Sequence, residues 1–193
     1  MAKYPLALFL LVFYASFSFA QVEDSLPERG MMLNPELSIA PEPGPILSSV
    51  ELQRQKIYKS LDKALVDPSK VYRLDLSGQK YREFPPQIFR LINLQELILS
   101  GNKLKEIPTD IHKLQNLELL VLTQNKLRTL PEEMKEMGNL SRLYVGENRL
   151  MTVPAWVGGL AKLRYLDLHG NYITLYEVSK IQERLPNCEI GFK

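Results

Sequence analysis

The sequence contains little of the chemistry on which catalytic and metal sites are commonly built. It has one cysteine, two histidines and one tryptophan among 193 residues. A single cysteine excludes a disulfide framework and a cysteine-rich zinc site, and two histidines leave little for a metal cage or for histidine-based catalysis. The sequence therefore predicts no enzyme activity, no bound metal and no cofactor.

An excess of one charge is also absent. The 24 Lys and Arg residues are offset by 22 Asp and Glu residues, which gives a formal net charge of +2. Proteins that bind nucleic acid through its phosphates usually present a strongly basic face. The balanced composition argues against a nucleic-acid partner, and the hydrophobic fraction of 45% is typical of a globular protein.

The first twenty residues have the features of a secretory signal peptide. Lys3 supplies a positive start, residues 6–13 form an unbroken apolar run, and Ser18 and Ala20 are the small residues that a signal peptidase requires. The apolar run is short for a membrane span, which needs about 20 residues. We expect cleavage after Ala20, export to the cell surface or medium, and no stable membrane insertion afterwards. An uncleaved membrane anchor is the alternative.

Residues 21–49 differ in composition from all that follows. They hold five prolines and few periodic apolar residues, and because proline fixes φ and removes a backbone donor, we expect a disordered tether. A proline-rich ligand for another domain is the alternative. Within residues 50–70, apolar residues then recur near helical spacing at Leu52, Tyr58, Leu61 and Leu65. This pattern predicts a capping helix over residues 50–66, ended by Pro68.

Residues 71–193 contain five units of 23 residues with a C-terminal helical cap. The units begin at Val71, Leu94, Leu117, Leu140 and Leu163. The second reads LQELILSGNKLKEIPTDIHKLQN and the third reads LELLVLTQNKLRTLPEEMKEMGN. Apolar residues at the fourth and sixth positions predict a short strand with one buried face, and stacking of the units predicts a parallel sheet. The fifth unit departs from the pattern after Ile173, where a longer helix is expected to end at Pro186. A closing segment follows, in which we expect Cys188 to be buried; a link between two chains through Cys188 is the alternative.

The ninth position of units two to five is asparagine. These residues are Asn102, Asn125, Asn148 and Asn171, and the first unit has Gln79 there. Because an amide both donates and accepts hydrogen bonds, stacked copies can satisfy the turning backbone, so we predict a structural asparagine ladder. The charged residues between the strands are predicted to be a solvated convex surface without a recognition role: Lys103, Lys105, Glu106, Glu132, Glu133, Lys135 and Glu136.

The spacing L-x-x-L-x-L-x-x-N-x-L is that of leucine-rich repeats, an α/β solenoid shaped as a horseshoe with a parallel sheet on its concave face. The 23-residue unit resembles bacterial and Ras-associated types, and the signal peptide argues against the intracellular eukaryotic ones. The segments IYKSLDKALVDPSKVYRLDLSGQKYREFPPQI and LPNCEI resemble small exported leucine-rich repeat proteins of spirochaetes, the leptospiral type. This resemblance implies a secreted or surface-exposed binding protein in contact with host cells.

The candidate binding residues come from the third and fifth positions of each unit, which a solenoid turns outward on its concave face. The third-position column is Arg73, Glu96, Leu119, Arg142 and Tyr165. The fifth-position column is Asp75, Ile98, Val121, Tyr144 and Asp167. Apolar side chains within a charged rim mark interaction sites, although β-branched and aromatic residues also simply suit strands.

We predict that Tyr144 and Tyr165 anchor a protein or glycoprotein partner, either on the host cell surface or, for an envelope scaffold, in the periplasm. An effector enzyme would need a further domain. His169 lies two residues after Asp167. We expect His169 to have a polar surface role, and a weak zinc site formed with Asp167 is the alternative.

Overall fold

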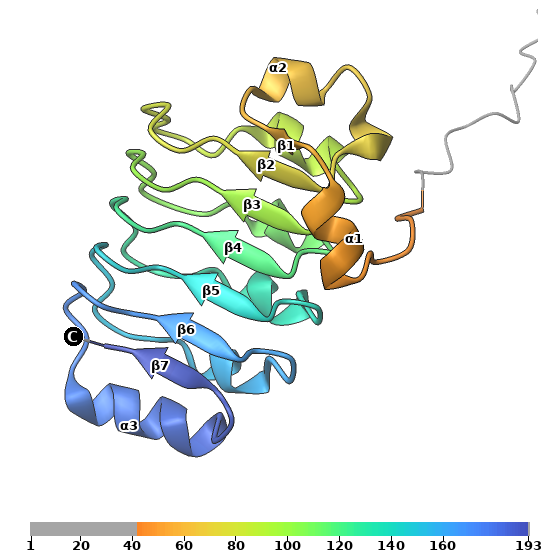
Figure 1. Cartoon of the computed structure of the whole chain (residues 1–193). Coiled ribbons are helices and arrows are strands. Elements are labelled where there is room, and N and C mark those ends of the chain that lie inside the picture. The colour runs from red at the N-terminus through yellow and green to blue at the C-terminus, as the bar shows by residue number, and fades with distance from the viewer. Residues whose placement is uncertain (1–41, 193) are drawn as a thin grey trace, which may run out of the picture. The chain divides into compact units, whose positions relative to one another are not determined.

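The computed structural model describes residues 42–192, in which seven strands form one parallel sheet. Their spatial order is their order along the chain (Figure 1). The strands are β1 (Ile57–Tyr58), β2 (Arg73–Asp75), β3 (Glu96–Ile98), β4 (Leu119–Val121), β5 (Arg142–Tyr144), β6 (Tyr165–Asp167) and β7 (Glu189–Gly191). Leu97 pairs with Leu74 on one side and Leu120 on the other, so the register advances by one 23-residue unit per strand. The predicted solenoid is therefore confirmed.

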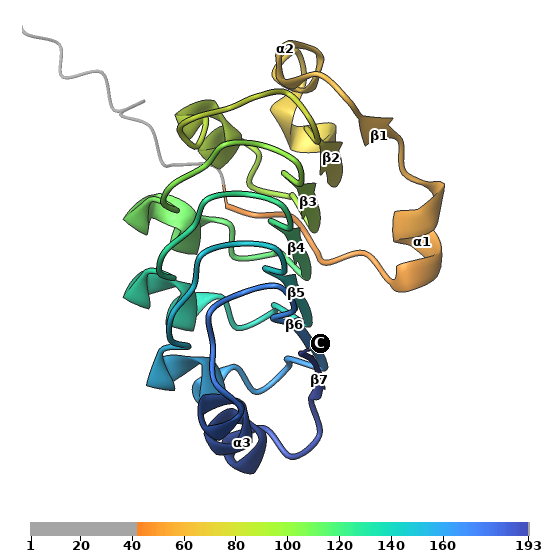
Figure 2. The same ribbon diagram turned by 90° about the vertical axis from the view of Figure 1, so that its left-hand side faces the viewer.

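Short 3-10 helices line the side of each unit opposite the sheet (Figure 2). They are η1 (Pro68–Lys70), η2 (Pro86–Arg90), η3 (Thr109–Lys113), η4 (Glu132–Glu136) and η5 (Ala155–Gly159). Pro108, Pro131 and Pro154 stand directly before η3, η4 and η5. Proline suits this place because its fixed φ leads into a helical turn and its missing N–H is not needed there.

One hydrophobic core runs between the sheet and the 3-10 helices. Leu97, Leu120, Leu143 and Leu166, at the fourth position of successive units, are fully buried. Such a unit cannot bury its apolar face alone, so each depends on its neighbours and the end units need covers.

The ninth-position asparagines join neighbouring units at the end of the strands. Asn125 donates from Nδ2 to the carbonyl oxygens of Leu99 and Leu122 at 3.0 and 2.9 Å, and its Oδ1 accepts from the Leu104 amide at 3.0 Å. Asn102, Asn148 and Asn171 make equivalent bonds. Gln79, at the same position of the first unit, is exposed.

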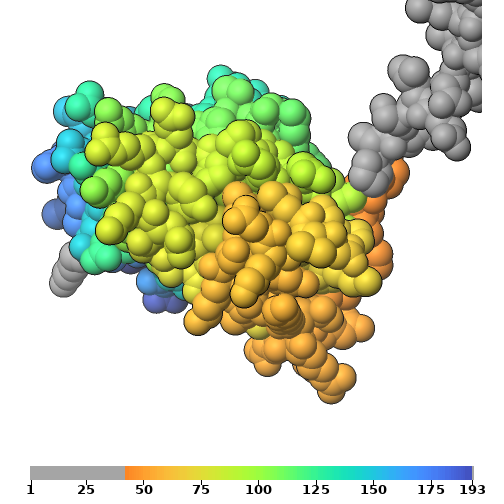
Figure 3. All heavy atoms as spheres, turned by 90° about the horizontal axis from the view of Figure 1, so that it is seen from above, coloured from red at the N-terminus to blue at the C-terminus, as the bar shows by residue number. Residues whose placement is uncertain are grey.

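The segment before the first repeat is not the single helix expected over residues 50–66. It forms α1 (Ser49–Arg54), the strand β1, and α2 (Leu61–Ala64). β1 pairs with β2, so it satisfies backbone groups along an edge of the sheet that a helix could not pair with. The segment packs directly on the first repeats, as the view from above shows (Figure 3).

Part of the expected tether is held against the repeats. The Gly44 amide donates to Oδ1 of Asn93 at 2.6 Å, and its carbonyl accepts from Nδ2 of Asn116 at 3.0 Å. Leu47 and Gln95 exchange two bonds, of 2.8 and 3.1 Å. The expectation of disorder is therefore wrong for residues 44–49, since these amides replace the water that would otherwise bind the extended backbone. The expected signal peptide and residues 21–41 of the tether lie outside the described residues.

The C-terminal end is covered by α3 (Leu175–Arg184) and β7. Thr174 and Glu177 form a capping box at the start of α3, which satisfies its first amide groups. Cys188 is buried, and burial raises the pKa of its thiol. Within residues 42–192, no helix has the length and apolar character needed to cross a membrane.

Candidate functional site

The strands bring all the predicted binding residues onto the sheet face that points away from the 3-10 helices. Strand pairing aligns the third-position column as Arg73, Glu96, Leu119, Arg142 and Tyr165, and the fifth-position column as Asp75, Ile98, Val121, Tyr144 and Asp167. The 23-residue period is the cause, because it returns each position to the same place on the next strand. The two columns nevertheless have different surroundings.

Helix α1 lies on this face, beside the third-position column (Figure 2). Its residues Ser49, Leu52 and Gln53 line one hollow together with Leu119 and Arg142. Leu52 and Leu119 are only 4% and 9% exposed. The expectation that Leu119 is an exposed contact is therefore wrong: the chain's own N-terminal helix occupies that part of the face.

The charged residues of the third-position column pair with one another. Nε of Arg73 lies 2.6 Å from Oε2 of Glu96, and Nη2 of Arg142 lies 3.6 Å from Oε1 of the same carboxylate. The Arg73 and Glu96 side chains are 19% and 13% exposed. These groups form a bridge across β2, β3 and β5 next to α1. Arg73 and Glu96 are therefore poorly placed as a free charged rim, whereas the Arg142 side chain is 44% exposed.

Apart from Asp167, the fifth-position column remains partly open, as does Tyr165. Ile98, Val121, Tyr144 and Tyr165, which we call the tyrosine patch, are all partly exposed. The ring centroids of Tyr144 and Tyr165 are 5.0 Å apart. Partial burial, with the negative charge of Asp167, raises the pKa of the Tyr165 phenol. The patch thus offers apolar surface together with phenol groups that can donate hydrogen bonds.

A polar cluster borders the patch at its C-terminal side. Asp167 is buried, whereas the sequence predicts an exposed position at the rim. Its Oδ1 lies 2.6 Å from Nδ1 of His169, which covers the carboxylate. Since a carboxylate can only accept, Nδ1 carries the proton. Nε2 of His169 lies 3.4 Å from Oε1 of Glu147. The hydrogen bond to Asp167, supported by the charges of both carboxylates, raises the pKa of His169.

Within the part of the chain that the structure describes, no group of three or more His, Cys, Asp or Glu side chains is arranged to hold a metal ion. Glu147 and Asp167 both contact His169, and Nε2 of Gln124 donates to Oε2 of Glu147 at 3.0 Å. The chemistry of this cluster is that of a pH-sensitive polar contact at the border of the face.

Sequence analysis missed the residues that hold the N-terminal segment on this face. Asn93, Gln95 and Asn116 are buried polar residues that bind residues 44–47. The available signal was the asparagine at the last position of the first three units, Asn93, Asn116 and Asn139, of which the first two bind Gly44.

Comparison with known proteins places these features in context. A family model described as a leucine-rich repeat region matches residues 69–185. A solved leucine-rich repeat protein of Leptospira interrogans is 37% identical over 72% of this chain, with a TM-score of 0.64, and the match spans 35% of that protein's chain. Internalin C2 of Listeria monocytogenes is 22% identical over 70% of this chain, with a TM-score of 0.57, and the match spans 57% of its chain. No curated protein sequence matches the chain.

Proposed function

Because the chain belongs to the leucine-rich repeat family, we propose that it is an exported protein that binds a protein or glycoprotein partner through the tyrosine patch. The observation that carries this proposal is the set of four large apolar side chains left partly open on neighbouring strands. Apolar side chains grouped on a surface favour a partner, and tyrosine is among the residues that contribute most to binding energy.

The position of α1 defines which part of the sheet face is available. The helix lies beside Leu119 and the Arg73–Glu96–Arg142 bridge, and Ile98 lines the edge of the same hollow. A partner would therefore meet the fifth-position column and the C-terminal strands, with Asp75 and the Asp167–His169 pair at its margins. The site is smaller than the ten residues that the sequence predicts.

The face can be tested by placing a photo-crosslinking benzoylphenylalanine at Val121 of the full-length protein. After the protein has bound to cultured epithelial cells, irradiation is expected to give discrete adducts from position 121. The matched control carries the crosslinker at Lys135, which lies on η4 on the opposite side of the same unit. Adducts of equal yield at both positions, or adducts that persist with Tyr144→Ala and Tyr165→Ala, would show that the patch is not the site.

The cellular location of the protein distinguishes a host-facing binding role from the second candidate function, an envelope scaffold in the periplasm. Protease shaving of intact cells is expected to digest the protein, or the medium is expected to contain it. Protection until the outer envelope is broken would instead move the search for the partner to the periplasm. An effector enzyme with a cysteine nucleophile has less support, because Cys188 is buried and its pKa is raised.

A further inference from the structure

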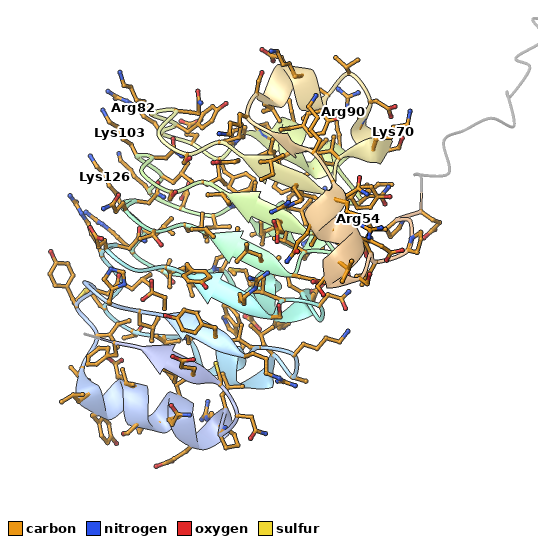
Figure 4. The ribbon with its side chains drawn as sticks, viewed as in Figure 1. Arg54, Lys70, Arg82, Arg90, Lys103 and Lys126 are labelled. Carbon is orange, nitrogen blue, oxygen red and sulfur yellow. The ribbon has the colours of Figure 1, made fainter. Side chains whose placement is uncertain are left out.

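A row of cations follows the edge of the solenoid where the chain leaves the strands. In the first four units, seven of the eight residues at the tenth and twelfth positions are Lys or Arg, and none is acidic. We call these residues the basic ridge: Lys80, Arg82, Lys103, Lys105, Lys126, Arg128 and Arg149. All seven are exposed, and Arg82, Lys103 and Lys126 lie one above the other at the same edge (Figure 4). Lys103 and Lys105 are solvated as expected, but Lys103 lies at this edge and not on the convex side.

Packing and backbone hydrogen bonds between repeat units fix the backbone of the residues that form the basic ridge. The residue between the two cations of each unit points inward, as Leu104 and Leu127 do. The amide of Lys103 donates to the Tyr81 carbonyl at 2.7 Å, and the amide of Lys126 donates to the Leu104 carbonyl at 2.8 Å. The backbone beneath the cations is thus bonded from unit to unit. A ligand on the ridge would not have to order this backbone.

Among the described residues, the ridge cations have no carboxylate partner, in contrast to three exposed lysines elsewhere in the chain. Lys70, Lys113 and Lys135 each lie within 2.9 Å of an acidic oxygen. Within residues 42–192, no ridge side chain lies within ion-pair distance of a carboxylate.

Some negative charge does lie near the ridge. Glu83 and Glu106 line a hollow together with four of the cations, so the local charge is reduced but stays positive. Because stacked strands are about 4.8 Å apart, like charges recur at short intervals and repel one another. An anionic ligand would relieve this repulsion.

We propose that the basic ridge binds a linear sulfated polysaccharide. A row two cations wide through three units, extended by Arg149 of the fourth, matches a chain with sulfates at regular intervals, since Lys and Arg both bind such oxyanions. The row ends at a hollow lined by Arg128, Arg149, Met151 and Tyr172, and Tyr172 is 70% exposed. Its ring can pack on the face of a sugar. The ridge is separate from the tyrosine patch, so this inference does not rest on the proposed function.

The ridge fits other polyanions less well. Proteins that bind single-stranded nucleic acid combine cations with aromatic side chains that stack on successive bases. Here every tenth and twelfth position of the first four units lacks an aromatic residue. A lipid bilayer presents a plane of charge rather than a line.

The test is binding of the full-length protein to a heparin dodecasaccharide, measured by titration calorimetry at several salt concentrations. The ridge variant carries Lys103→Gln and Lys126→Gln. The control carries Lys113→Gln and Lys135→Gln, which remove the same charge from the same two units but lie on η3 and η4. We expect the ridge variant to bind at least tenfold more weakly, with a shallower dependence on salt, and the control to stay within twofold.

A second ridge variant, Lys105→Gln with Arg128→Gln, should show the same loss, which guards against a local folding defect in the first. Heparin with its sulfates removed should not bind. The proposal is overturned if the dodecasaccharide does not bind at 150 mM salt, if ridge and control variants lose affinity equally, or if single-stranded DNA or phosphatidylserine vesicles bind more tightly than heparin.

Discussion

Tyr144 and Tyr165 stand on neighbouring strands with their ring centroids 5.0 Å apart and their planes inclined at 39°. Tyr144 is paired in register with Asp167, and Tyr165 with Arg142, so the two rings meet diagonally across β5 and β6. This contact joins the third-position column to the fifth. It makes one continuous surface of side chains that belong to different repeat units.

The ring pair should contribute to stability as well as to binding. Aromatic pairs in such arrangements contribute about 0.5–1.5 kcal/mol beyond the area they bury. We expect a double-mutant cycle of Tyr144→Ala with Tyr165→Ala, measured by urea unfolding, to give a coupling free energy of this size. A second cycle, with Tyr144→Phe in place of Tyr144→Ala, should give a much smaller coupling, because the ring is kept. Additive losses in the first cycle would show that the rings are adjacent without interacting.

Asn125→Ala should be among the most costly single substitutions in the chain. It leaves the buried Leu104 amide without a partner, at about 1–3 kcal/mol. It also removes one of the two donors to each of the Leu99 and Leu122 carbonyls, which keep their bonds from Asn102 and Asn148. Urea unfolding should show a loss of at least ~2 kcal/mol. The matched control is Gln79→Ala at the ninth position of the first unit, where the side chain is exposed and the change should stay within about 0.5 kcal/mol. Equal losses would contradict a bridging role.

The His169–Asp167 contact predicts a pH-dependent stability. The folded state raises the pKa of His169 above its ordinary value of 6.5, so the folded protein binds this proton more tightly than the unfolded chain does. The resulting stabilisation is fully present below pH 6.5 and is lost as the pH rises through the raised pKa. Thermal unfolding from about pH 5.5 to 8.5 should show this loss in the wild type and in His112→Gln, and a flatter profile in His169→Gln. An unchanged profile in His169→Gln would assign the dependence to other groups.

Gly146 leaves the space that His169 occupies. A Cβ at this position would collide with Cε1 and Nδ1 of the His169 ring and would lie 2.8 Å from Oδ2 of Asp167. We expect Gly146→Ala to push the imidazole away and lower the pKa of His169 toward its ordinary value, as followed by NMR titration. Overpacking should also cost about 1–3 kcal/mol. Gly138→Ala is the control, since nothing lies within 4 Å of its added methyl group.

Leu52 should hold α1 on the sheet face. Leu52→Ala removes a side chain that is only 4% exposed, whereas Val50→Ala, in the same helix, removes one that is 59% exposed. Trypsin cleavage after Arg54 in the full-length protein should accelerate about tenfold or more in Leu52→Ala, which corresponds to a local loss of at least ~1.4 kcal/mol. It should change little in Val50→Ala. Equal cleavage rates would mean that the hydrogen bonds of residues 44–47 hold the segment without Leu52.

The repeat part of the fold follows from periodicity. Units that repeat Leu97, Leu99 and Asn102 every 23 residues can bury their apolar positions only by stacking in register, so the parallel sheet was predictable from local pattern. The positions of the columns on the sheet face were predictable for the same reason. The ends were less predictable: Ile57–Tyr58 carries no strong strand signal, and it is a strand because β2 offers an unpaired edge.

The sequence by itself determined the solenoid, its register and the residues that its face could present, because a short-range period specifies neighbour packing without knowledge of the rest. Only the tertiary structure decided which of these residues are free. It placed Leu52 beside Leu119, paired Arg73 and Arg142 with Glu96, and turned Asp167 toward His169. It also left the basic ridge without ion pairs to any carboxylate among residues 42–192. These outcomes depend on distances between side chains in different units and on a segment outside the repeats, which no repeating pattern encodes.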